Sequence, residues 1–138
     1  MAQLVDTSVF VSLERRGMAL PDVSWSEEPI ALSSFTAAEL LDGVYRADTA
    51  ERRLRRETFI EAALEHLEVL PFDLAAARVY ARVWAVLSSQ GQRISVNDLI
   101  IAATALAHDF GVLTENVREF ERVPGLVVHR PDWDAASR

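Results

Sequence analysis

The sequence predicts an α/β fold with three layers, in which a mainly parallel sheet of four to five strands lies between helices. Short apolar runs alternate with longer amphipathic segments along the 138 residues. Short apolar runs are typical of buried parallel strands, whereas apolar residues three and four positions apart indicate helices. No repeat, low-complexity tract or linker interrupts the alternation, so we expect residues 1–138 to form a single domain.

The composition is that of a globular protein without disulfides. Half of the residues are apolar, a quarter are charged and none is cysteine, which excludes thiolate metal sites. We expect a cytoplasmic protein with no membrane association, because no apolar run has spanning length and the N-terminus lacks the pattern of a signal peptide. The net charge of −7 argues against broad electrostatic binding to nucleic acid.

In the first half of the chain, each of two short strands is followed by a helix, and a long helix comes next. Gly17 ends the first helix, Ser34 caps the second, and Asp48 or Thr49 caps the third. Residues 18–29 form a loop containing Trp25, which we expect to cover an apolar edge. The predicted strands cover residues 1–5 and 29–33, and the predicted helices cover 8–16, 35–47 and 49–67.

The long helix carries a dense group of charges, namely Arg52, Arg53, Arg55, Arg56, Glu51 and Glu57. Residues four positions apart on a helix can pair, so we expect ion pairs Glu51–Arg55 and Arg53–Glu57 on a solvated face. The alternative is that these arginines contact phosphate, which guanidinium groups bind well. All fourteen basic residues are arginine, but a GC-rich coding bias explains that as well.

The second half of the chain predicts three further strands. Asp73 caps a helix that ends at Gly91, and Ser95 opens another helix that ends at Gly111. We expect the tail around Trp133 to be loosely ordered. The predicted strands cover 68–72, 112–114 and 126–129, and the helices cover 73–90, 96–109 and 116–120.

Four acidic residues are candidates for a functional site, and each also has an ordinary structural interpretation. Asp6 directly follows the first strand, where ligands bind in open α/β sheets, but it could also cap a helix. Glu39 could be an exposed helix residue. Asp98 could form a capping box with Ser95, and Glu119 could form one with Asn116.

Taken together, the acidic segments resemble the PIN-domain nucleases, in particular the VapC-type toxins of type II toxin–antitoxin modules. The segments that carry this resemblance are Asp6-Thr7, Ala38–Leu41, Asp98–Ala105 and Leu113–Phe120, and the resemblance extends over nearly the whole chain. It implies a PIN-like fold, cleavage of RNA, a VapB-type antitoxin as partner, and a homodimer, or a heterotetramer or larger assembly with the antitoxin. It also implies that Asp6, Glu39 and Asp98 bind metal, whereas the fourth acidic position falls to either Asn116 or Glu119.

The chemistry of these residues fits the implied activity. Clustered carboxylates need a cation to remain ionised together, and oxygen ligands without nearby histidine or cysteine favour Mg²⁺ or Mn²⁺. His66, His108 and His129 lie away from the acidic segments in the sequence. The hydroxyl or amide side chains that could assist water or phosphate are Thr7, Ser8, Thr114 and Asn116.

Two other functions compete with the metal-dependent endoribonuclease. A non-catalytic PIN-like module could bind RNA or protein. The resemblance favours this alternative in one respect, because the family often has an Asp at the fourth acidic position, whereas this sequence has Asn116 and Glu119 there. A phosphoacceptor signalling domain would also combine an acidic pocket with Mg²⁺. Such domains resemble this chain less, because their pattern includes a lysine near the pocket and this sequence has no lysine.

Overall fold

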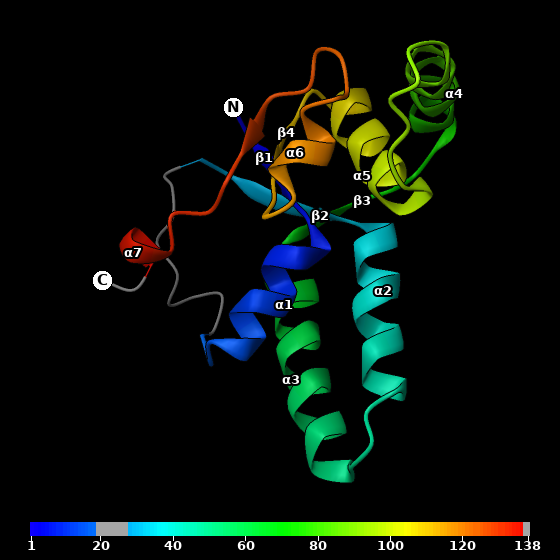
Figure 1. Cartoon of the computed structure of the whole chain (residues 1–138). Helices are drawn as coiled ribbons and strands as arrows, with labels where there is room; N and C mark the ends of the chain where they lie inside the picture. Colours follow the sequence, from blue (N-terminus) through cyan, green and yellow to red (C-terminus); the bar gives the residue numbers. More distant parts are fainter. Residues whose placement is uncertain (19–27, 137–138) are drawn as a thin grey trace.

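The computed structural model describes residues 1–18 and 28–136, which form one sheet flanked by helices (Figure 1). The predicted parallel sheet is confirmed: it has five strands, all parallel, in the order β3-β2-β1-β4-β5. The strands are β1 (Gln3–Val5), β2 (Ile30–Ser33), β3 (Glu68–Leu70), β4 (Gly111–Leu113) and β5 (Val128–His129). The chain builds the sheet outward from β1 in both directions, so a topological switch point lies between β1 and β4.

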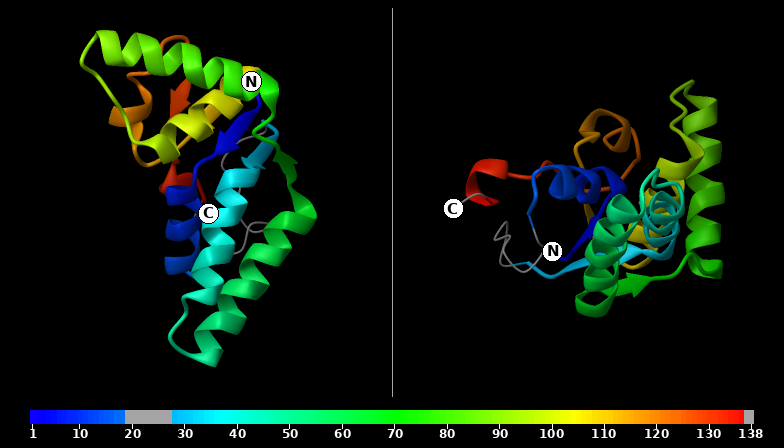
Figure 2. Two further views of the ribbon diagram at one scale, coloured as in Figure 1. Left: turned by 90° about the vertical axis from the view of Figure 1, so that its right-hand side faces the viewer. Right: turned by 90° about the horizontal axis from the view of Figure 1, so that it is seen from below.

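Helices cover both faces of the sheet, which confirms the predicted three layers. Leu4 and Val112 pack in one apolar cluster with side chains of α4 and α5, whereas Val5 and Leu113 pack in another with side chains of α1 and α3. Figure 2 shows α1, α2 and α3 grouped together, apart from α4 and α5. The helices are α1 (Thr7–Arg15), α2 (Ser34–Tyr45), α3 (Ala50–His66), α4 (Leu74–Ser89), α5 (Val96–Ala107), α6 (Val117–Phe120) and α7 (Trp133–Ala136).

Side-chain caps fix most helix starts close to their predicted places. Thr49, Asp73 and Ser95 each accept a hydrogen bond from the backbone amide three residues on, which confirms these three caps. The predicted cap Ser34 is wrong by one residue. Ser33 Oγ accepts the amide of Thr36 at 2.9 Å, because Ser33 still has extended backbone whereas Ser34 already belongs to α2.

The end of α5 also differs from the prediction. The helix stops at Ala107, and the residue with left-handed backbone is Asp109, at φ 60°. Gly111 instead begins β4, where a Cβ atom would lie 3.1 Å from the carbonyl oxygen of Val127. Glycine at this position therefore favours close packing of the strand against Val127 and does not terminate the helix.

Two further expectations are wrong for the described residues. The tail is held in place, because Trp133 Nε1 donates to Glu115 Oε1 at 2.8 Å and the guanidinium of Arg16 lies 4.2 Å from the Trp133 ring centroid. On α3, neither of the two predicted glutamate–arginine pairs is formed, and Arg52 and Arg56 pair with Asp48 and Glu14 instead.

The expectation for Trp25 lies outside the described residues. None of the described helices combines the length and the apolar character needed to cross a membrane.

Candidate active site

Asp6 lies at the carboxyl end of the central strand and is almost completely buried, with 4% of its surface exposed. Its Oδ2 atom accepts hydrogen bonds from Ser8 Oγ and from Thr114 Oγ1, each at 2.8 Å. Thr114 follows β4, the neighbouring strand, so parallel pairing of β1 with β4 brings the two residues together. Asp6 occupies the N-cap position of α1, but its side chain makes no capping bond there. The capping interpretation is therefore wrong, and the buried carboxylate is held by two hydroxyl groups.

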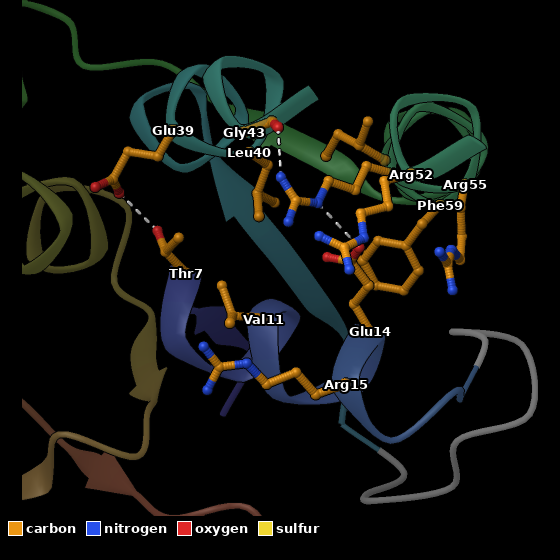
Figure 3. Close-up of a pocket in the computed structure, with 12 residues that line it drawn as sticks. Thr7, Val11, Glu14, Arg15, Glu39, Leu40, Gly43, Arg52, Arg55 and Phe59 are labelled. Atoms are coloured by element: carbon orange, nitrogen blue, oxygen red, sulfur yellow. Dashed lines mark hydrogen bonds and ion pairs between the residues drawn. The ribbon is translucent and has the colours of Figure 1, made fainter. Parts of the chain in front are cut away.

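Glu39 reaches the same edge of the sheet from α2. Thr7 Oγ1 donates to Glu39 Oε1 at 2.7 Å (Figure 3), and Asn97 Nδ2 donates to Glu39 Oε2 at 3.4 Å. Thr7 belongs to α1 and Asn97 to α5, so three helices contribute to the position of this one carboxylate. Glu39 is thus a partly buried, hydrogen-bonded side chain, and the interpretation as an ordinary exposed helix residue is wrong.

Asp98 and Glu119 lie together around the side-chain amide of Asn116. Asn116 Nδ2 donates to Asp98 Oδ2 at 3.0 Å and to Glu119 Oε2. Ser95 Oγ accepts the amide of Asp98 at 3.2 Å, so the Ser95 cap is present while the Asp98 carboxylate is directed towards Asn116 and Glu119. Asn116 makes no side-chain capping bond to α6, so the second predicted capping box is wrong.

The electrostatics of this pair are unusual for surface carboxylates. Burial raises the pKa of Asp98 to about 7, and the hydrogen bond with Glu119 and the negative charges of Asp6 and Glu119 add to the rise. The hydrogen bond from Asp98, supported by the one from Asn116, lowers the pKa of Glu119. The two carboxyl groups therefore influence each other's pKa in opposite directions, and the charge of Asp6 is close enough to add to the rise at Asp98.

Divalent-metal binding at this edge of the sheet has support from the donor types, but the side chains are not gathered around one point. The donors are carboxylate, hydroxyl and amide oxygens, which suit Mg²⁺ or Mn²⁺. The raised pKa of Asp98 also indicates negative charge that a cation could neutralise in place of a proton. Within the described residues, however, no three acidic or histidine side chains lie close enough to hold a single ion. The residues therefore fit the ion in the chemistry of their donor atoms.

All four predicted auxiliary side chains contact a candidate acid. Thr7 binds Glu39, Ser8 and Thr114 bind Asp6, and Asn116 binds Asp98 and Glu119. Asn116 and Glu119, the two candidates for the fourth position, lie in direct contact with each other.

Two contributors, Thr36 and Asn97, were not predicted. Thr36 is fully buried and its hydroxyl oxygen lies 3.1 Å from that of Thr7, and Asn97 contacts Glu39. Thr36 lies three residues before Glu39 and Asn97 lies directly before Asp98, which are the only signals in the sequence that could have indicated them.

Comparison with known proteins identifies relatives along nearly the whole chain. Residues 4–126 match the family model described as "PIN domain". The chain is 36% identical to ribonuclease VapC1 of Rickettsia felis over 129 residues, which cover 93% of this chain and 95% of the relative. It is also 36% identical over 104 residues to the tRNA(fMet)-specific endonuclease VapC of Shigella flexneri, with 75% of each chain covered.

A solved complex has a similar fold. In the VapBC2 complex of Rickettsia felis bound to a DNA fragment from their promoter, one chain superimposes with a TM-score of 0.82 at 26% identity. The match covers 96% of this chain and 100% of that chain. The similarity therefore includes the order of strands and helices as well as the sequence.

Proposed function

We propose a mechanism from the premise that this chain belongs to the VapC ribonucleases of the PIN-domain family. The protein is a nuclease of this family, and our proposal concerns how it acts: as a Mg²⁺- or Mn²⁺-dependent endoribonuclease that hydrolyses RNA phosphodiester bonds. The observation that carries the proposal is the buried carboxylate of Asp6, which Ser8 and Thr114 hold at the carboxyl end of β1 and whose charge helps to raise the pKa of Asp98. Carboxylates converging from separate segments are expected where a cation and a phosphate meet.

In this mechanism Asp6, Glu39 and Asp98 would hold the metal ion. When bound, the ion would orient the phosphate, lower the pKa of a water molecule and stabilise the departing oxygen. The hydroxyls of Ser8 and Thr114 keep Asp6 oriented by donating to Oδ2. The bound cation would offset the mutual repulsion of the three carboxylates.

Glu119 and Asn116 have roles that do not require direct contact with the ion. Asn116 donates to both Asp98 and Glu119, which fixes the distance between α5 and the start of α6. The pKa of Glu119 is lowered, chiefly by its hydrogen bond with Asp98 and further by the one from Asn116, so Glu119 would act as a hydrogen-bond acceptor at the site rather than as a strong base. Asn116 positions this carboxylate.

The proposal includes a protein partner and a cellular location. The structural relative above is a complex of VapB and VapC chains, which supports a VapB-type antitoxin as the partner of this chain. A cationic side chain of the antitoxin would be attracted to Asp6 and Asp98, because opposite charges at an interface favour association. A homodimer, a heterotetramer or larger assembly with the antitoxin, and a cytoplasmic location where RNA and antitoxin are made, belong to the same proposal.

One observation favours a second candidate function, a PIN-like module that binds RNA or protein without cutting it. Within the described residues Glu39 is directed to Thr7 and Asn97, and no three acids gather to hold an ion. A protein that only binds RNA or protein needs no metal ion, so its acidic side chains need not gather around one.

Incubation of the purified chain with a mixed RNA pool, with Mn²⁺ and with EDTA, separates the two functions. We expect fragments only in Mn²⁺, and none from an Asp6→Asn variant that retains the wild-type melting temperature. Intact RNA in both conditions, with unchanged RNA binding, would replace the nuclease with the binding module.

A further inference from the structure

The last helix, α7, packs beside α1, although the two helices are far apart in the sequence (Figure 2). The indole ring of Trp133 is partly buried against the apolar cluster that contains Val9 and Leu13 of α1. The guanidinium of Arg16 lies 4.2 Å from the centroid of the same ring, within the range of a cation–π interaction. Contacts with α1 therefore fix the position of the Trp133 ring.

The side chain of Glu115 joins α7 to α1. Trp133 Nε1 donates to Glu115 Oε1 at 2.8 Å, and Ser12 Oγ donates to Glu115 Oε2 at 2.7 Å. Both carboxylate oxygens thus have a donor, although the residue is exposed to solvent. Because an exposed glutamate otherwise samples several rotamers, two simultaneous bonds restrain this side chain and the backbone to which it is attached.

Residues 114–116, which we call the site segment, also belong to the candidate active site. Thr114 donates to Asp6, and its Oγ1 accepts the backbone amide of Asn116 at 2.9 Å. The backbone amide of Glu115 donates to Ser8 Oγ at 3.3 Å. The side chain of Glu115 is therefore bonded to α1 and α7, while the groups next to it in the chain are bonded to the acidic site.

We infer that Trp133 and Glu115 are positioning residues for RNA cleavage: by holding the site segment, they keep its other side chains in contact with the acids. Those side chains are Thr114, which contacts Asp6, and Asn116, which contacts the other pair of acids. The inference rests on the proposed function, because it takes these acids as the place of cleavage. Adjacent residues move together, so release of Glu115 would displace its neighbours on both sides. A displacement of about 1 Å at a reacting site lowers the rate by about two orders of magnitude.

The first variant removes a single hydrogen-bond donor. Trp133→Phe retains an aromatic ring for apolar packing and for the cation–π contact, but it lacks the N–H group that donates to Glu115. The matched control is Trp84→Phe on α4. Trp84 is also partly buried and has a guanidinium, that of Arg93, 5.6 Å from its ring centroid, but it packs on the cluster at the opposite face of the sheet.

The second pair of variants changes the acceptor. Glu115→Ala removes both oxygens. Glu115→Gln is the conservative variant, because its side-chain oxygen can accept from Trp133 and its amide can donate to the hydroxyl of Ser12. Retained function in Glu115→Gln therefore distinguishes hydrogen bonding from negative charge at this position.

The first measurement is hydrogen exchange of the backbone amides of residues 115 and 116 in EDTA, corrected for the intrinsic rate of each sequence. We expect exchange to be about fivefold to tenfold faster in Trp133→Phe and Glu115→Ala, because a lost hydrogen bond favours local opening. Glu115→Gln and Trp84→Phe should exchange at the wild-type rate. Unchanged exchange in both Trp133→Phe and Glu115→Ala would overturn the inference.

The second measurement is the rate of RNA cleavage in Mn²⁺, with melting curves to establish that each variant is folded. We expect kcat to fall about tenfold to hundredfold in Trp133→Phe and Glu115→Ala. KM for RNA should change less than about twofold, because the two residues act through the site segment and not on the substrate. Wild-type kcat in both variants despite faster exchange would overturn the inference, and so would equal loss of kcat in Glu115→Gln and Glu115→Ala.

Failure of the proposed nuclease function is a separate result. It would appear as intact RNA when the unmodified chain is incubated with Mn²⁺. The exchange measurement uses neither metal nor RNA, so it decides whether Trp133 and Glu115 hold the site segment whatever the chain does to RNA.

Discussion

Replacement of Asp98 by asparagine should abolish RNA cleavage while leaving the metal-free protein at least as stable as the wild type. Asparagine retains the backbone amide that donates to Ser95 Oγ, so the helix start is unchanged. Its side-chain oxygen can accept the bond from Asn116, and its amide can donate to Glu119. The variant therefore loses one negative charge and little hydrogen bonding.

The size of the effect on stability follows from the pKa of Asp98. That pKa is raised from 3.8 to about 7 in the fold, and one unit corresponds to about 1.4 kcal/mol. The ionised carboxylate thus destabilises the metal-free fold by at most about 4 kcal/mol above pH 7, and solvent screening at this partly buried position reduces the figure. We expect the variant to gain about 1–2 kcal/mol at pH 8, or about 3–8 °C in melting temperature.

The pH dependence has a definite sign. Because the folded pKa is raised, the contribution of Asp98 to stability is fully present below pH 3.8 and is lost as the pH rises through about 7. The wild type in EDTA should therefore lose part of its stability across this range, and the variant should lose less. Mn²⁺ should restore stability to the wild type at pH 8 and have a smaller effect on the variant.

Thermal unfolding at pH 5 and pH 8, with EDTA or Mn²⁺, measures these differences, and cleavage of an RNA pool is measured on the same preparations. Cleavage at the wild-type rate by a folded Asp98→Asn protein would refute the assignment of Asp98 as a metal ligand. A variant that melts several degrees below the wild type at pH 8 would refute the electrostatic reasoning, because the residue would then be stabilising.

Three further predictions concern the metal site, the support of Asp6 and the partner. A triple replacement of Asp6 and Asp98 by asparagine and Glu39 by glutamine should abolish the Mn²⁺-induced rise in melting temperature; an equal rise in both proteins would exclude a shared ion. Thr114→Val should destabilise the fold by about 1.5–3 kcal/mol and slow RNA cleavage, because Asp6 loses a buried hydroxyl donor. The control Thr58→Val, on the exposed face of α3, should change neither stability nor cleavage. Identical melting temperatures and cleavage rates for the two variants would contradict the role of Thr114. Finally, size-exclusion chromatography should show a homodimer that forms a larger complex with a VapB-type antitoxin, and a monomer that ignores the antitoxin would contradict the partner.

Local patterns predicted most of the fold correctly. The strand and helix order follows from apolar periodicity, and three caps follow from single residues, Thr49, Asp73 and Ser95, at helix starts. These features depend on neighbours within a few positions, so the sequence contains what is needed to predict them. The errors arose where a local rule allowed two answers, as with the adjacent serines Ser33 and Ser34.

The candidate acids could be selected from the sequence, but their surroundings could not. Asp6 occupies the N-cap position of α1 and has a side chain that could cap the helix, yet it bonds to Thr114, which lies 108 residues away in the sequence. In the same way Thr7 contacts Glu39 at a separation of 32 residues. Helix-capping rules consider only near neighbours, and therefore they gave Asp6 a structural role that it does not have.

The sequence by itself thus determined the parallel α/β architecture and which carboxylates are available, because periodicity and residue type are local properties. Only the tertiary structure decided that Asn116 contacts both Asp98 and Glu119, and that burial raises the pKa of Asp98. Each of these depends on side chains from separate elements meeting at the carboxyl edge of the sheet. The physical reason is that hydrogen bonds, burial and charge interactions depend on distance in space, which spacing along the chain does not specify.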